Sequence, residues 1–480
     1  MEEMKMEVNE AVENTSAEDT KENKMGVMPM NKLLLNMALP MMASMLIQAC
    51  YNVVDSAFVA RLKDGAEAAT SGTAALNAVG MAFPFQTLLI AVGSGTCVGV
   101  NALLSKALGE KDTKTVNKAA NNGVFLALMS YLVFLFVGIF LSETLIKSQG
   151  GDGLTLVYGT QYLSIVCIGS IGIYMQFIFE RLLQSTGRTF YTMITQMTGA
   201  IINIILDPIL IFGYFGFPEL KVAGAAVATI IGQICAALLA IYFNTTKNPE
   251  VKVALRKFRP DKTIIARIYA VGIPSIAMQA IGSVMTYSMN KMLTALNKDS
   301  VAVFTVYFKL QSFFFMPVFG LNNGLVPILS YNYGAQKRSR MIKVIKLSML
   351  YAFGFMVLGF TVFQTVPQYL LRIFDTGDPS LITLGVPALK IISCHFLLAW
   401  FCMISLTVFQ ALGNGIYSLI VSAARQLIVL IPAAYFLGKM GGLDLIWWAF
   451  PIAEMMSVTV SSLFLIHIYR KIIKKVPDLP

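Results

Sequence analysis

The sequence predicts an all-α polytopic membrane protein with twelve transmembrane helices in two parallel repeats of six. Of its 480 residues, 56% are hydrophobic and only 13% are charged, which is unlike the composition of a soluble domain. The apolar residues form long continuous runs rather than the short alternating segments of a membrane β-barrel. Each run is long enough to cross a hydrocarbon core of about 30 Å as a helix.

The expected spans follow a polar segment that is rich in Glu, Asn, Thr and Lys. Because that segment lacks the apolar core of a signal peptide, we expect a disordered cytoplasmic tail. The spans are expected at 33–58, 76–103, 120–142, 160–182, 190–213, 222–243, 266–295, 301–330, 345–371, 382–411, 416–438 and 444–468. The chain is thereby divided into a tail at 1–31, an N-terminal bundle at 32–243, a basic cytoplasmic linker at 244–265, a C-terminal bundle at 266–470 and a cytoplasmic tail at 471–480.

Basic residues predict the orientation of these spans. Lys and Arg are concentrated in the 104–120 loop, the linker, the 335–346 loop and the C-terminus, whereas the alternate loops hold few. Because basic loops stay on the cytoplasmic side, we expect both termini in the cytoplasm. Membrane topology thus accounts for the net charge of +11, and we expect no nucleic-acid partner.

The two halves carry the same small residues at matching positions. Such residues let helices pack closely, and a repeat of six spans gives both halves the same orientation, as in parallel repeats about an axis along the membrane normal. The matches are Gly95, Gly99, Ser105 and Gly109 with Gly320, Gly324, Ser330 and Gly334, then Gln184, Gly187 and Tyr191 with Gln410, Gly413 and Tyr417, and Pro40 with Pro274.

The fifth expected span holds a carboxylate that predicts an ion or proton site. Asp207 lies in an apolar run, where a charge costs about 2.5–3.5 kcal/mol on insertion scales. Asn203 precedes it by four residues, so both side chains lie on one helix face. Pro208 has no amide donor, which would leave the carbonyl of Ile204 without its helical partner. The alternative is a packing role for Asn203 and a cation elsewhere that pairs with Asp207.

Residues of two other spans are expected at the same depth. At about 1.5 Å per residue, Asp55 in the first span and Asp207 both fall in the outer half of the membrane. Thr229 lies near the outer end of the sixth span, and Tyr51 lies one turn below Asp55. We therefore expect Tyr51, Asp55, Asn203, Asp207 and Thr229 to converge in one outer-leaflet pocket of the N-terminal half.

Two other acids have structural alternatives. Glu180 lies near the cytoplasmic end of the fourth span beside Arg181, where an interfacial ion pair and a functional acid are equally open. Arg425 and Glu454 lie on adjacent spans and are expected to neutralise each other.

No motif in the sequence indicates catalysis, so we expect a protein that is not an enzyme and has no cofactor. The stretch Gly93–Gly99 has some likeness to a dinucleotide loop, but it follows no strand and is better explained by close helix packing. The six cysteines lie in apolar runs without metal or disulfide spacing. His395 and His467 are expected to be structural.

Several motifs, in order along the chain, resemble those of the multidrug and toxic-compound extrusion (MATE) family. They cover the chain from about Lys32 to the C-terminus, and their order together with the repeat is more specific than any one of them. They are Pro40-Met-Met-Ala-Ser, Asp207-Pro208 after Asn203, Gly224-Ala-Ala-Val-Ala-Thr229, Gly320-Leu-Asn-Asn-Gly324, Tyr333-Gly334-Ala335 and Gln410-Ala-Leu-Gly413.

The resemblance implies an antiporter that exports organic cations and drugs against proton or sodium entry, by alternating access of two bundles in a V. It implies that the coupling cation, H+ or Na+, binds at Asp55, Asn203, Asp207 and Thr229. Supporting roles are implied for Tyr51, Glu180 and Pro40, where the first span could bend. The acids of spans seven and ten that form a second site in some members have no counterpart here, which concentrates coupling in the N-terminal half.

Two other functions stay open from the residues alone. A lipid-linked saccharide flippase of related architecture would need buried cations to hold pyrophosphate, whereas buried acids outnumber buried bases in the N-terminal half. A non-transporting scaffold or receptor would not depend on Asp55 or Asp207. For the transporter we expect a monomer in the plasma (inner) membrane of a bacterium, with membrane lipids and amphipathic organic cations as partners.

Overall fold

A computed structural model describes residues 23–60, 68–150, 152–254, 258–297, 299–373 and 379–479. Within these ranges, the side chains of 51–60, 68–77, 299, 302, 379 and 380 are not described. The described chain is helical apart from turns and one isolated β-bridge between Lys337 and Asp478. The predicted all-α class is therefore confirmed.

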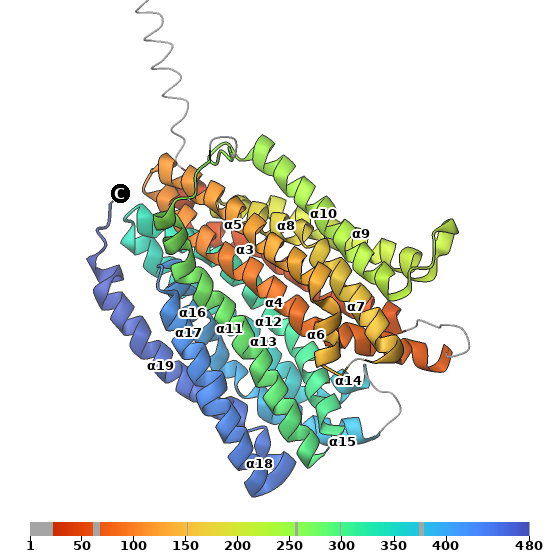
Figure 1. Cartoon of the computed structure of the whole chain (residues 1–480). Coiled ribbons are helices and arrows are strands. Elements are labelled where there is room, and N and C mark those ends of the chain that lie inside the picture. Colours follow the sequence, from red (N-terminus) through yellow and green to blue (C-terminus); the bar gives the residue numbers. More distant parts are fainter. Residues whose placement is uncertain are drawn as a thin grey trace, which may run out of the picture.

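The long helices lie side by side and share one general direction (Figure 1). The N-terminal half contains α2 (Lys24–Val27), α3 (Met30–Ala60), α4 (Ala68–Gly109), α5 (Thr113–Phe140), α6 (Ser142–Ser148), α7 (Gly153–Ile168), α8 (Ile171–Ser185), α9 (Thr189–Phe212), η2 (Tyr214–Gly216) and α10 (Lys221–Lys247). The C-terminal half contains α11 (Lys262–Leu296), α12 (Asp299–Gly334), α13 (Arg338–Thr365), α14 (Pro367–Arg372), α15 (Pro379–Ser393), α16 (Phe396–Ala411), α17 (Gly415–Ala423), the π-helix η4 (Ala424–Leu430), α18 (Ile431–Ile446), α19 (Ala449–Lys471) and η5 (Ile473–Lys475).

Twelve spans account for the long apolar helices of the described chain. Ten helices are long and apolar enough to cross a membrane, and two bent pairs bring the number to twelve if each pair is one span. The pairs are α7 with α8, bent by 43°, and α15 with α16, bent by 51°. The breaks fall at corresponding places in the two halves, namely the fourth and the tenth predicted span.

The structure differs from the expected disordered tail at 1–31 in the part that it describes. Residues 24–27 form α2, and α3 already begins at Met30. Met25 and Met30 are buried among residues of the C-terminal half, and this apolar contact explains why the segment is ordered although it directly follows a polar stretch. Residues 1–22 lie outside the described chain.

The first and the last described residues lie at the same end of the molecule, which we call the terminal end. Met25 in α2 and Asp478 near the C-terminus both bond to residues at or next to the turn between α12 and α13. Lys106 and Glu110, where α4 ends, lie against the same turn. The terminal end also carries the basic loops on which the predicted orientation depends.

The two halves meet through α3, α4, α11 and α12 in a reciprocal arrangement. Helix α4 of the N-terminal half packs along α11, and α12 of the C-terminal half packs along α3. The first turns of α3 are accordingly buried in the same apolar cluster as the C-terminal helices. The division at 244–265 into two bundles, and their V shape, stay predictions.

Glycines make this close packing possible. A Cβ atom at Gly99 would lie 2.0 Å from the carbonyl oxygen of Ile268 in α11. In the matching place of the other half, a Cβ atom at Gly324 would lie 3.1 Å from the Cα of Ala38 in α3. The repeated glycines of the sequence are therefore contact points between the halves, as expected for small residues between membrane helices.

The last turns of α4 and α12 cross each other at a second pair of glycines. A Cβ atom at Gly109 would lie 2.0 Å from the carbonyl oxygen of Tyr331, and one at Gly334 would lie 2.1 Å from that of Lys106. The two contacts are equivalent, because Lys106 and Tyr331 are separated by the same offset as the two glycines. The crossing therefore lies on the axis that relates the repeats.

The matched serines confirm this relation inside each half. Ser105 donates through its hydroxyl to the carbonyl of Ser185 at the end of α8, at 3.1 Å. Ser330 makes the same bond to the carbonyl of Ala411 at the end of α16, at 2.8 Å. Each half thus uses its serine to tie the second helix of the repeat to the end of its bent span.

The alanine variant Gly99→Ala should lower the thermal stability of the purified protein. Its methyl group would overlap the backbone of Ile268, and such overpacking costs about 1–3 kcal/mol. Gly80→Ala on the same helix is the matched control, since nothing lies within 4 Å of its Cβ position. A melting curve of Gly99→Ala in detergent that superimposes on those of wild type and control would contradict the packing described here.

Candidate cation site

Helices α9 and α10 approach each other so closely that polar side chains on them meet. A Cβ atom at Gly232 of α10 would lie 2.6 Å from the carbonyl oxygen of Gly199 in α9. Nearer the loop between the helices, a Cβ atom at Gly224 would lie 2.5 Å from the carbonyl oxygen of Leu210. The two close approaches bracket the level of Asn203 and Thr229, and so fix the distance between these side chains.

Asn203, Asp207 and Thr229 form one buried polar cluster between the two helices. Their exposed fractions are 3%, 0% and 6%. With its amide oxygen toward α10, Asn203 accepts from the backbone nitrogen of Thr229 at 3.0 Å, and its amide nitrogen donates to Asp207 Oδ2 at 3.2 Å. The reverse orientation would turn the amide nitrogen toward another donor.

The hydroxyl of Thr229 completes the link. It lies 3.1 Å from the amide oxygen of Asn203 and 3.0 Å from the carbonyl of Ala225, one turn earlier in α10. A single hydroxyl proton is shared between these two acceptors. In this orientation the amide nitrogen of Asn203 faces the carboxylate of Asp207, and the amide oxygen faces Thr229. A buried carboxylate held by a neutral donor suits a proton, whereas a hard cation would need the amide to turn its oxygen toward Asp207.

The other predicted members of the pocket lie on α3. Tyr51 and Asp55 belong to α3, which packs against α9, but their side chains lie outside the described residues. Their convergence with Asp207 therefore stays a prediction. Pro40 and Pro208 are both accommodated inside continuous helices, α3 and α9, so Pro208 does not end its helix at this place.

Glu180 is buried but does not pair with its neighbour Arg181. Its carboxylate accepts from Gln176 Nε2 at 3.0 Å, from Thr195 Oγ1 at 2.9 Å and from Gln196 Nε2 at 2.8 Å. Three neutral donors on α8 and α9 thus surround the carboxylate, and the alternative of an ion pair with Arg181 is not what the structure shows. Gln176 lies four residues before Glu180 on the same helix, and this spacing could have indicated the bond. Nothing in a single sequence links the two donors on α9 with an acid on α8.

Arg181 points to the other half of the molecule. Consecutive residues on a helix face in different directions, so Arg181 turns away from the site of Glu180. Its guanidinium donates to Gln184 Oε1 at 2.7 Å and to Asn323 Oδ1 of α12 at 3.0 Å. This contact between halves was not predicted from the sequence.

In the C-terminal half, the expected pair of Arg425 and Glu454 is confirmed. Arg425 Nη1 lies 3.4 Å from Glu454 Oε2, and the Glu454 side chain is only 3% exposed. Arg425 belongs to the π-helix η4. Such a local widening of the helix occurs frequently at functional sites. The pair neutralises a charge that would otherwise be buried alone.

The two histidines have structural surroundings, as expected. His395 is buried at the break between α15 and α16, where its Nδ1 lies 2.6 Å from the carbonyl of Ile392 and its ring contacts Phe396. His467 packs beside the ring of Tyr417, with centroids 6.1 Å apart. No contact of either residue reaches the cluster of Asn203, Asp207 and Thr229 among the described residues.

Comparisons with known proteins agree with this architecture. The sequence model of the MatE family matches residues 40–209 and 274–436. Relatives named multidrug export protein MepA, from Staphylococcus aureus strain NCTC 8325 and from Staphylococcus saprophyticus, are each 26% identical over 92% of this chain and 94% of their own length.

Solved structures show the same fold. One is described as the outward-facing conformation of a multidrug resistance MATE family transporter of the MOP superfamily, with a TM-score of 0.87 and 24% identity over 95% of this chain and 99% of that one. A transporter of the MOP superfamily from Pyrococcus furiosus has a TM-score of 0.84 and 24% identity over 94% and 99%.

Removing Arg425 should destabilise the protein strongly. Arg425→Met leaves Glu454 buried without a counter-charge, and breaking a buried pair from one side costs about 3–5 kcal/mol. Adding Glu454→Met should restore most of the loss, since an apolar pair of similar volume needs no neutralisation.

The control is Lys147→Met, which breaks the exposed pair with Glu143 and should leave the melting temperature unchanged. An Arg425→Met variant that melts at the wild-type temperature would show that the Arg425–Glu454 contact has no energetic role.

Proposed function

Because this chain belongs to the MatE family, we propose that it is a secondary active antiporter that exports organic cations and drugs, coupled to the entry of protons or sodium ions. The names of the multidrug export relatives support the substrate class. Their similarity extends over nearly the full length of this chain and of each relative. The fold supports a transporter of two related halves, because it repeats the same helix contacts about one axis.

The observation that carries the proposal is the buried carboxylate of Asp207. It is fully shielded and accepts from Asn203, which in turn is bonded to Thr229. An ionisable group at this depth is costly, so such groups in membrane helices mark ion and proton pathways. We propose that the coupling cation binds there, together with Asp55 and with Tyr51 nearby.

The two cations would use the cluster in different ways. A proton needs only the carboxylate of Asp207, with Asn203 and Thr229 holding the carboxylate in place. A sodium ion needs several oxygens at once, so the Asn203 amide would have to turn its oxygen from Thr229 to an ion beside Asp207. The need for an amide oxygen distinguishes the sodium site from the proton site.

Alternating access would use the contacts between the halves. The described glycine contacts of α4 and α12 run from mid-helix to the terminal end. The two halves therefore contact each other at that end through residues that the repeat places at matching positions. A site that opens away from the terminal end matches the solved relative described as outward-facing. We propose that binding of the cation shifts α3 near Pro40 and releases the drug to the outside.

The relatives and the charge pattern support a proposal for the membrane in which the protein works and for its orientation there. We propose that it works as a monomer in the plasma membrane of a bacterium, with both termini in the cytoplasm, because the terminal end carries the basic loops. The wealth of Met and Phe, 27 and 32 residues, offers an adaptable apolar surface for drugs of different shapes.

Asp207→Asn should abolish export and leave expression intact, because the amide keeps the shape of the side chain but cannot bind and release a cation. The measurement is the accumulation of a cationic dye in cells, which should rise to the level of cells without the protein. Asp152→Asn, at an exposed carboxylate before α7, is the matched control and should export normally. Normal export by Asp207→Asn at equal expression would remove the assigned coupling site.

A further inference from the structure

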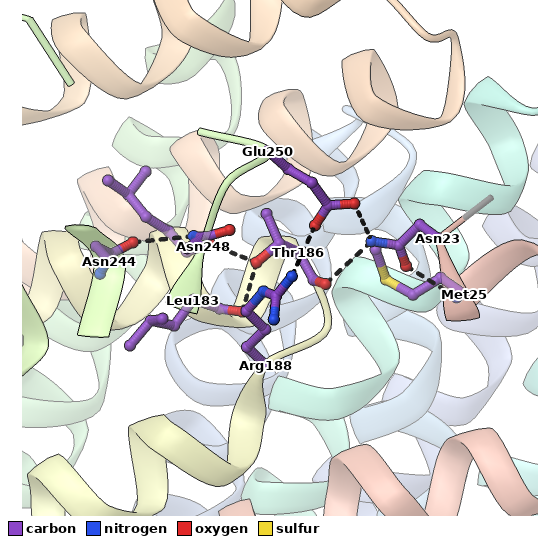
Figure 2. A network of polar contacts seen from close by, with 9 residues as sticks. Asn23, Met25, Leu183, Thr186, Arg188, Asn244, Asn248 and Glu250 are labelled. Carbon is purple, nitrogen blue, oxygen red and sulfur yellow. Dashed lines mark hydrogen bonds and ion pairs between the residues drawn. The ribbon is translucent and has the colours of Figure 1, made fainter. Parts of the chain in front are cut away.

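The segment Asn23–Met28, which includes the short helix α2, contacts both halves of the molecule at the terminal end. An isolated helix of one turn is not stable in water, so the order of this segment comes from its contacts. Figure 2 shows the side that faces the N-terminal half, where Asn23 lies between Thr186 and Glu250. The contacts with the C-terminal half are made through backbone carbonyls of the segment.

On the first side, the Asn23 amide is fully used. Its nitrogen donates to Glu250 Oε1 at 2.7 Å and to the carbonyl of Thr186 at 3.1 Å. Its oxygen accepts from the backbone nitrogen of Met25 at 2.9 Å and so caps α2. One side chain therefore both starts the helix and fastens it to the N-terminal half.

The partner Glu250 is itself held in place. It forms an ion pair with Arg188 at 3.8 Å, just after the turn that ends α8. The neighbouring Asn248 donates to the carbonyl of Leu182 at 3.3 Å and to Asn244 Oδ1 at 3.0 Å (Figure 2). Segment 248–250 of the linker is thereby fixed on α8 and α10, and Asn23 binds to a rigid surface.

On the second side, three backbone carbonyls of the segment accept from the C-terminal half. Arg340 Nη2 donates to the carbonyl of Met25 at 3.0 Å and to that of Met28 at 2.8 Å. Asn332 Nδ2 also donates to Met25 at 3.1 Å, and Lys337 Nζ donates to Gly26 at 3.3 Å. These donors surround the turn between α12 and α13, next to the crossing of the two glycines.

The apolar side of the segment adds to these contacts. Met25 is completely buried in the cluster formed by the first turns of α3 and the C-terminal helices. Burying a side chain of this size contributes about 1.5–3 kcal/mol. The segment thus bridges the halves with one buried methionine and with hydrogen bonds to both halves.

We propose that Asn23–Met28 is a latch that holds the terminal end closed and must leave the α12–α13 turn before the halves can part there. The proposal rests on the proposed alternating access, which requires the terminal end to open in one state. Among the residues of the C-terminal half, Arg340 donates to two of the latch carbonyls, those of Met25 and Met28. Release would need the loss of the hydrogen bonds to the backbone of the latch and the withdrawal of Met25 from its apolar cluster.

The latch can be tested by the exposure of a buried interface in the full-length protein. Thr96 on α4 is 3% exposed and packs against Gly272 of α11, so a cysteine there reacts only when the halves separate. We would place Thr96→Cys in a chain whose six native cysteines are replaced by serine, reconstitute it in lipid nanodiscs, and measure its labelling rate with a water-soluble maleimide.

Arg340→Ala and Asn23→Ala should each accelerate the labelling, by roughly tenfold for Arg340→Ala, which corresponds to about 1.4 kcal/mol. Arg338→Ala is the matched control, because Arg338 lies two residues away and donates to the carbonyl of Lys474 rather than to the latch. Its labelling should match that of the parent chain.

Wild-type labelling rates in both Arg340→Ala and Asn23→Ala would overturn the latch. If Arg340→Ala fails to fold, Asn23→Ala decides alone, because it leaves α12 and α13 untouched. The assay does not depend on any drug or ion. Faster labelling in a protein that exports nothing would therefore keep the latch and reject the antiporter, while unchanged labelling in an active exporter would do the reverse.

Discussion

The close approach of helix backbones at glycine is the constraint on which this structure depends. Lipid offers no hydrophobic drive for two apolar helices to associate, so backbone contact and packing must hold them together. Here α4 and α12 cross where Gly109 and Gly334 leave no room for a Cβ atom. From that crossing, each helix runs along a helix of the other half, α11 and α3 respectively. The relation between the halves is thus set by the positions of a few glycines.

The same principle positions the chemistry inside the N-terminal half. Gly199 and Gly232 let α9 and α10 touch, and this contact allows an amide on one helix to bond to the backbone of the other. A buried carboxylate next to that amide is then fixed in a place that water does not reach. The C-terminal half holds its buried acid differently, because Glu454 is already neutralised by Arg425. The asymmetry gives the two halves different electrostatic roles within one repeated architecture.

The sequence predicted the features that depend on spacing within one helix or on the repeat. Asn203 and Asp207 share a face because they are four residues apart, and the matched glycines share an offset that survives in the fold. Thr229 was expected near Asn203 from its position in the sixth span, and the two residues are hydrogen-bonded in the structure. Partners on different helices could not be predicted, which is why the donors from α9 to Glu180 and the contact of Arg181 with Asn323 were missed. The polar composition before α3 also concealed the buried contacts of Met25.

In the proposed mechanism, a cation gradient drives export through the buried carboxylate of the N-terminal half. The most direct measurement is transport of a cationic dye by the purified protein in proteoliposomes, with a proton gradient or a sodium gradient imposed separately. We expect dye to move against its own gradient when one of these cation gradients is present, and this movement to stop when both are collapsed. Uphill transport that persists without either gradient, or no dependence on either cation at any dye concentration, would contradict this mechanism.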